Sequence, residues 1–154
     1  MQNNIKAEIN PEDSHLELLM ALKRKELKEI RRNWNFKGIS GLNKKALAVE
    51  LSRRITSNVL PWLETQSYIY SLIKEIATND DGVIYPEINS KRDLQIIKYL
   101  QEMSVVFSGK YEDADLILYM PPELRTNIKS VIKYNTSLDK KISRNPETTT
   151  ARLL

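Results

Sequence analysis

The chain has 154 residues, of which 41% are apolar and 29% are charged, a composition typical of a folded globular protein rather than a disordered one. It contains no cysteine, which excludes disulfides, thiolate metal sites and thiol chemistry. No apolar run approaches the roughly 18 residues of a membrane-spanning helix, and the first residues lack the apolar core of a signal peptide. We therefore expect a soluble, cytoplasmic protein with no membrane partner.

The net charge of +4 is distributed unevenly along the chain. Residues 20–56 hold eleven basic and three acidic residues, a balance of +8. Residues 1–19 hold one basic and four acidic residues, and residues 57–154 hold twelve and thirteen. Because all the excess positive charge lies in one stretch, the sequence indicates a polyanionic partner.

Residues 1–15 are mostly polar and are predicted to form a loose N-terminal arm. From Ser14 onward apolar residues recur at helical spacing, which predicts a first helix that ends in the stretch Asn33–Gly38. The apolar positions of this helix are Leu16, Leu19, Met20, Leu27, Ile30 and Trp34. His15, the single histidine, is predicted to be a solvated residue at the helix start rather than a base.

A second helix is predicted to begin after Asn43, a favourable N-cap, and to run from Lys44 to Ile55. Asn58–Pro61 should break or bend this pattern, because proline disrupts a helix interior. Residues 16–56 then form a basic helical hairpin, and residues 64–124 form a second unit. The boundary is soft, since apolar residues beside Pro61 could pack the two together.

The second unit combines helices with short strands, followed by a weakly periodic C-terminal segment over residues 125–154. The two late strands should form a hairpin with a longish loop over residues 108–115, and Pro122 suits the first turn of a last helix. The predicted fold class is mainly α with a small β-hairpin. The expected elements are helices over Gln66–Ala77 and Arg92–Met103 and strands over Val83–Tyr85, Val105–Phe107 and Leu116–Tyr119.

A short motif spans the basic hairpin. It reads Leu22-x4-Leu27-x2-Ile30, then Phe36-Lys-Gly-Ile39, then Leu42-x-Lys-Lys-x-Leu47-x3-Leu51. This frame resembles the SAP and Rho N-terminal families of helix-extended-helix modules, and the resemblance covers about forty of the 154 residues. It implies a small helical fold whose usual ligand is DNA or RNA.

Five basic residues are the candidate nucleic-acid contacts. Lys44 and Lys45 lie at a helix amino end, where the macrodipole disfavours cations but free N–H groups help to bind a phosphate. Arg31, Arg32 and Lys37 could extend that surface along a backbone. The alternative is that the lysines are ordinary solvated surface. The aromatics Trp34 and Phe36 are expected to pack in the core rather than stack on bases.

The second unit resembles a degenerate winged helix, with Arg92–Met103 in the place of the recognition helix. Its wing carries Glu112, Asp113 and Asp115, and since acidic side chains repel phosphates, ordinary wing contacts are not expected. Protein contact or packing is an equal alternative. Together the two units also resemble uncharacterised bacterial proteins that end in a SEC-C metal-binding motif. The cysteine and histidine ligands of that motif are missing, and Arg144–Leu154 is typical of a helix cut short.

Enzyme chemistry is not predicted, because the sequence has neither a cysteine nucleophile nor a glycine-rich phosphate loop. Metal binding by Asp80–Asp81 or by the Glu112 loop is also not favoured. We predict a non-enzymatic protein, without cofactor or metal, that binds DNA or RNA. The alternatives are a protein-interaction scaffold that binds an acidic protein or a second copy, and an inhibitor that occupies a nucleic-acid groove on another protein.

Overall fold

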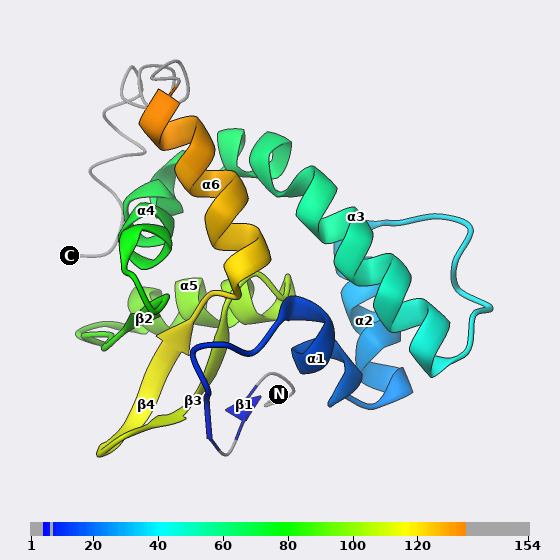
Figure 1. The fold of residues 1–154 in the computed structure, drawn as a ribbon, viewed down its shortest axis with the longest axis horizontal. Coiled ribbons are helices and arrows are strands. Elements are labelled where there is room, and N and C mark those ends of the chain that lie inside the picture. Colours follow the sequence, from blue (N-terminus) through cyan, green and yellow to red (C-terminus); the bar gives the residue numbers. More distant parts are fainter. Residues whose placement is uncertain (1–4, 7, 135–154) are drawn as a thin grey trace.

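The computed structural model describes residues 5–6 and 8–134 of the chain (Figure 1). Helices dominate and a small sheet lies at one side, so the predicted mainly α fold class with a small β-hairpin is confirmed. In chain order the elements are β1 (Ile5–Lys6), α1 (His15–Met20), α2 (Arg24–Trp34), α3 (Lys44–Glu64), the 3-10 helix η1 (Ser67–Ile69), α4 (Tyr70–Thr78), β2 (Val83–Ile84), α5 (Lys91–Glu102), β3 (Phe107–Tyr111), β4 (Ala114–Tyr119) and α6 (Pro122–Tyr134).

The predicted first helix is in fact two helices, α1 and α2, separated by residues 21–23. The Ser14 side chain accepts a hydrogen bond from the Glu17 backbone and the Glu17 carboxylate accepts one from the Ser14 backbone, so α1 starts with a capping box. The Glu26 carboxylate accepts a hydrogen bond from the backbone N–H of Lys23 at 2.9 Å, which supports a second helix start. α2 then ends at Trp34, and its C-cap residue Asn35 has a left-handed backbone with φ 59°.

Of the two alternatives predicted at Asn58–Pro61, a break or a bend, the break is wrong, because α3 continues through Pro61 to Glu64. Pro61 and Ser57, the residue whose carbonyl loses its helical partner, are both exposed, so water can bond that carbonyl. The opposite face of α3 is an unbroken buried stripe that favours the continuous helix. It comprises Leu47, Leu51, Ile55, Val59 and Leu63.

α2 and α3 lie side by side and run in the same direction, because the irregular segment 35–43 brings the chain back before α3 begins (Figure 1). The guanidinium of Arg24, at the start of α2, donates to the carbonyl of Leu42 just before α3. Arg54, in the middle of α3, donates to the carbonyl of Lys37 just after α2. Side chains of both helices therefore bond to the segment 35–43 that connects α2 to α3.

The sheet has the strand order β1-β3-β4-β2, with β1 parallel to β3 and the other pairs antiparallel. The long loop predicted over residues 108–115 is wrong, because most of these residues pair within the hairpin. Ser108 lies opposite Leu118 and Gly109 opposite Ile117, so β3 and β4 meet in a tight turn. Glu112 takes a left-handed backbone in that turn, with φ 51°.

The N-terminal arm is not loose over residues 8–13. Ile9 is buried, and its backbone N–H donates to the carbonyl of Lys110 at 2.7 Å. The Tyr119 hydroxyl lies 2.9 Å from the carbonyl oxygen of Pro11 and 2.7 Å from that of Asp13. Sequence polarity therefore misled the prediction, because the arm is held mainly by its backbone groups.

One apolar core joins the helices to the sheet. α3 contacts α1, α2 and α6, and α4 contacts α6 on the other side of the molecule (Figure 1). α6 starts at Pro122, as predicted. Among the described residues no helix is both long and apolar enough to cross a membrane. The segment Arg144–Leu154 lies outside the described residues.

Candidate nucleic-acid interface

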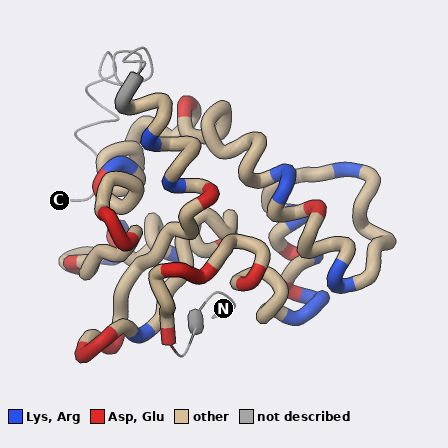
Figure 2. The backbone as a smooth tube through the Cα atoms, viewed as in Figure 1, with Lys and Arg blue, Asp and Glu red and all other residues tan. Residues whose placement is uncertain are grey.

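Basic residues are concentrated at the end of the molecule formed by α2, the segment 35–43 and the first half of α3 (Figure 2). We call residues 23–54 the basic module. Its exposed basic residues are Lys23, Arg24, Lys25, Arg32, Lys37, Lys44, Lys45 and Arg53, and its half-buried ones are Lys28, Arg31 and Arg54. Most of the positive charge that the sequence concentrates here is therefore on the surface.

Lys44 and Lys45 form one group at the amino end of α3, where both are exposed. Asn43 caps this helix, since its side-chain oxygen accepts from the backbone N–H of Ala46 at 2.9 Å. Arg24 lies next to them, because its Nη2 and Nε donate to the carbonyl of Leu42 at 2.8 and 3.2 Å. The amino ends of α2 and α3 thus contribute cations to the same part of the surface.

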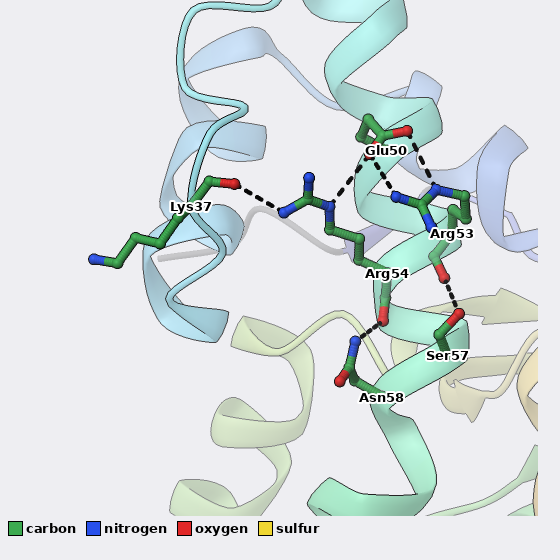
Figure 3. A network of polar contacts seen from close by, with 6 residues as sticks. All are labelled: Lys37, Glu50, Arg53, Arg54, Ser57 and Asn58. Carbon is green, nitrogen blue, oxygen red and sulfur yellow. Dashed lines mark hydrogen bonds and ion pairs between the residues drawn. The ribbon is translucent and has the colours of Figure 1, made fainter.

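Arg31 and Lys37 belong to a second group near the carboxyl end of α2. The Arg31 Nη1 donates to the carbonyl of Phe36 at 3.0 Å, and its Nε is buried with no hydrogen-bond partner among the described residues. Arg54 donates to the carbonyl of Lys37 at 2.9 Å, while the Lys37 ammonium points away into solvent (Figure 3). Arg32 is exposed on α2 beside Arg31.

The five predicted contact residues therefore lie in two groups rather than in one. Lys44 and Lys45 belong to the first group, beside Arg24, and Arg31, Arg32 and Lys37 belong to the second. Arg24 and Arg31 are seven positions apart on α2, which places the groups roughly 10 Å apart along the helix axis. Arg31 is largely engaged with the carboxyl end of α2, whereas Arg32, Lys37, Lys44 and Lys45 extend from the surface.

The sequence did not identify Arg24 and Arg54 as structural residues. Their guanidinium groups donate hydrogen bonds to carbonyls near the two ends of segment 35–43. Arg54 follows Glu50 at i+4 on α3, a spacing that could have identified the pair. The carbonyl partners of both arginines lie at least 17 residues away in sequence, at Lys37 and Leu42, and no pattern predicts them.

Glu50 is the acidic residue at the centre of this polar network (Figure 3). Its carboxylate contacts Arg53 at 2.8 Å and Arg54 at 3.2 Å. The hydrogen bond from Arg53, assisted by that from Arg54, lowers the pKa of Glu50 below its ordinary value. Glu50 thereby orients two guanidinium groups on the exposed side of α3.

The acidic segments that could cover the basic module lie elsewhere in the described structure. Residues 9–13 of the arm bond to β3, β4 and Arg125 of α6. Glu112 lies at the tip of the hairpin, at the other end of the molecule (Figures 1 and 2). Neither segment neutralises the exposed lysines and arginines of the basic module.

Trp34 and Phe36 are half-buried and pack against the core. Their rings stack with centroids 5.5 Å apart and an angle of 14° between planes. The indole Nε1 of Trp34 also donates to the carbonyl of Met103 at 2.7 Å. The two aromatics thus join the basic module to the end of α5 while part of their surface remains exposed.

The prediction that His15 is solvated is wrong, because its side chain is completely buried. Its Nδ1 lies 3.0 Å from the hydroxyl of Ser52, and its Nε2 lies 2.9 Å from the carbonyl oxygen of Ser104. Burial lowers the pKa of His15 to about 4, so the ring is neutral at physiological pH. It connects α1, α3 and the α5–β3 turn.

The surface of the second unit, residues 64–124, carries both basic and acidic residues, unlike the mainly basic surface of the basic module. On α5, Arg92, Gln95 and Lys98 are exposed and Tyr99 is half-buried, while the acidic residues of the hairpin tip are exposed. No group of three or more metal-ligating side chains occurs in the described part of the chain.

A cavity of about 450 Å³ opens between α4, α5 and the sheet. Its lining contains two carboxylates, from Glu75 and Glu87, and no lysine or arginine, so it is unsuited to phosphate. The lining residues are Ser71, Leu72, Glu75, Ile84, Tyr85, Pro86, Glu87, Asn89, Ile97 and Leu118.

Comparisons of the chain with protein-family profiles, with curated proteins and with solved structures gave no significant match.

Proposed function

We propose that this protein binds the sugar-phosphate backbone of DNA or RNA through the basic module and performs no chemistry on it. The observation that carries the proposal is the exposure of most of the module's cations, with the acidic arm and hairpin tip located elsewhere. The resemblance of residues 22–51 to SAP and Rho N-terminal modules supports the same reading.

The two groups of exposed cations suit a flexible polymer that carries a negative charge at every repeat. Lys44 and Lys45 act as exposed point charges at one group, and Lys37 and Arg32 do so at the other. Two groups roughly 10 Å apart along a helix can contact phosphates several positions apart on one strand. Contacts of this kind position a nucleic acid without reading its sequence, so we expect weak sequence selectivity.

Fluorescence anisotropy with labelled single- and double-stranded DNA and RNA, at 50 and 200 mM salt, tests the proposal. If about four phosphates are contacted, affinity should fall roughly 50- to 150-fold between these salt concentrations. Absent or salt-independent binding would overturn the proposal. A stoichiometric acidic protein partner that survives nuclease treatment would instead favour a protein-interaction scaffold.

A further inference from the structure

Four half-buried aromatic rings form a row across the segment 35–43 and three helices. From Phe36 the row passes to Trp34, then to Trp62 on α3 and then to Tyr99 on α5. Successive ring centroids are 5.5, 5.6 and 6.2 Å apart. We call these four residues the aromatic row.

The aromatic row is held in place by hydrogen bonds at its edges. The indole of Trp34 donates to the carbonyl of Met103 at 2.7 Å, and that of Trp62 donates to the hydroxyl of Tyr99 at 3.2 Å. The indole N–H groups are thus satisfied within the protein, and all four side chains remain half-buried rather than fully buried. Rings fixed in this way lose little conformational freedom when a planar ligand stacks on them.

Positive charge lies at the Phe36 end of the aromatic row. The guanidinium of Arg54 is 5.9 Å from the centre of the Phe36 ring, within the range of a cation–π contact.

Arg54, which contacts the Phe36 ring, also donates to the carbonyl of Lys37, and the side chain of Asn58 donates to the carbonyl of Arg54 (Figure 3). Trp62 follows Asn58 by one helical turn on the same side of α3. Arg54 and Lys37 therefore lie at the Phe36 end of the aromatic row, and Trp62 and Tyr99 extend the row to α5.

We propose that the aromatic row is a base-stacking surface for a single-stranded nucleic acid, whose phosphates are contacted by Lys37 and Arg54. This inference rests on the proposed function and specifies its ligand. Paired strands bury the faces of their bases, whereas single strands expose them to aromatic side chains.

The test compares four labelled probes on the full chain by fluorescence anisotropy: a dT12 strand, an rU12 strand, an abasic 12-mer with the same phosphates, and a 12-base-pair duplex. Stacking of even one base should make dT12 bind at least about 5-fold tighter than the abasic strand. The rU12 strand distinguishes RNA from DNA as the source of the bases. The two tryptophans of the chain, Trp34 and Trp62, both belong to the aromatic row, so dT12 should also quench the intrinsic fluorescence and the abasic strand should not.

A matched pair of variants provides a second measurement. Phe36→Leu retains an apolar side chain but removes the ring, and it should reduce the preference for dT12 over the abasic strand. Tyr85→Leu changes an aromatic residue that is 58% exposed and lies outside the row, and it should leave the preference unchanged.

The outcomes separate the two proposals. Equal affinity for dT12 and the abasic strand, or tighter binding of the duplex, would overturn the stacking surface and leave backbone binding intact. Failure of all four probes to bind would overturn both. A clear preference for dT12 or rU12, with tryptophan quenching, would support both.

Discussion

The imidazole of His15 and the hydroxyl of Ser52 meet at 3.0 Å and join α1 to α3. The carbonyl of Ser104 can only accept, so Nε2 of His15 carries the hydrogen and donates to it. Nδ1 must then accept from the Ser52 hydroxyl. The buried ring is thus fixed in one neutral tautomer by groups from two other parts of the chain.

Acid should destabilise the protein through His15. The pKa of the side chain is about 4 when folded and 6.5 when free, so between these values the unfolded chain binds a proton that the folded protein does not. The free energy of unfolding should therefore fall by roughly 3 kcal/mol as the pH drops from 6.5 to 4, with no contribution from this group above pH 6.5. Urea unfolding at several pH values measures the change.

The His15→Gln variant is the control for this prediction. It has no titrating ring, so its stability should depend less on pH across that window than that of the unchanged protein. Identical pH profiles for the two proteins would show that His15 does not account for acid sensitivity.

Ser52→Ala should destabilise the protein by about 1–3 kcal/mol, because it leaves Nδ1 of the buried His15 without a donor. The matched control is Ser57→Ala on the same helix. Ser57 is exposed and donates only to the carbonyl of Arg53, one turn earlier, so its loss should change stability by less than about 0.5 kcal/mol. Chemical denaturation of both variants at pH 7 makes the comparison, and equal losses would contradict it.

Three glycine-to-alanine variants should separate backbone strain from steric overlap. Gly82 has φ +69°, and a Cβ there would lie 2.5 Å from Nε of Arg125 and 2.6 Å from the carbonyl oxygen of Met120. Gly38 has φ +80° with open space, and Gly41 has open space without that strain.

We expect Gly82→Ala to lose roughly 3 kcal/mol or more, Gly38→Ala about 1 kcal/mol, and Gly41→Ala almost nothing. Thermal or urea unfolding gives the order. A Gly82→Ala protein as stable as Gly41→Ala would show that the turn beside Arg125 can rearrange.

Reversing the charge of Lys44 and Lys45 should weaken nucleic-acid binding by at least about 10-fold and reduce the salt dependence by about two phosphate contacts. Both side chains are exposed, so circular dichroism and melting should stay near those of the unchanged protein. The charge-matched control is Lys110→Glu with Lys129→Glu, at exposed positions on β3 and α6. If both double variants lose affinity equally, net charge rather than the basic module controls binding.

Periodicity and charge were enough to predict much of the fold. The apolar spacing located α4 and α5, the Asn43 cap located the amino end of α3, and Pro122 marked the start of α6. The exposed positions of Lys37, Lys44 and Lys45 also follow from their place outside the apolar pattern. Local signals of this kind act over a few residues, so a single sequence displays them.

The errors occurred where distant residues decide the structure. Pro61 continues a helix because the buried stripe on the opposite face outweighs one missing hydrogen bond. Ser108 and Gly109 form a strand because they pair with Leu118 and Ile117. His15 is buried by partners 37 and 89 residues away. The aromatic row likewise depends on Tyr99 meeting Trp62 from another helix.

The packing of the N-terminal arm has a consequence for how the protein is made. Pro11 bonds to Tyr119 and Arg125, and His15 bonds to Ser104, so these residues find their partners only after a further 89 to 114 residues have been synthesised. At about 5–20 residues per second, a ribosome needs roughly 5–20 s to cover that distance. Meanwhile α2 and α3 are already complete, and the nascent chain can pair these helices well before its beginning docks against the late hairpin.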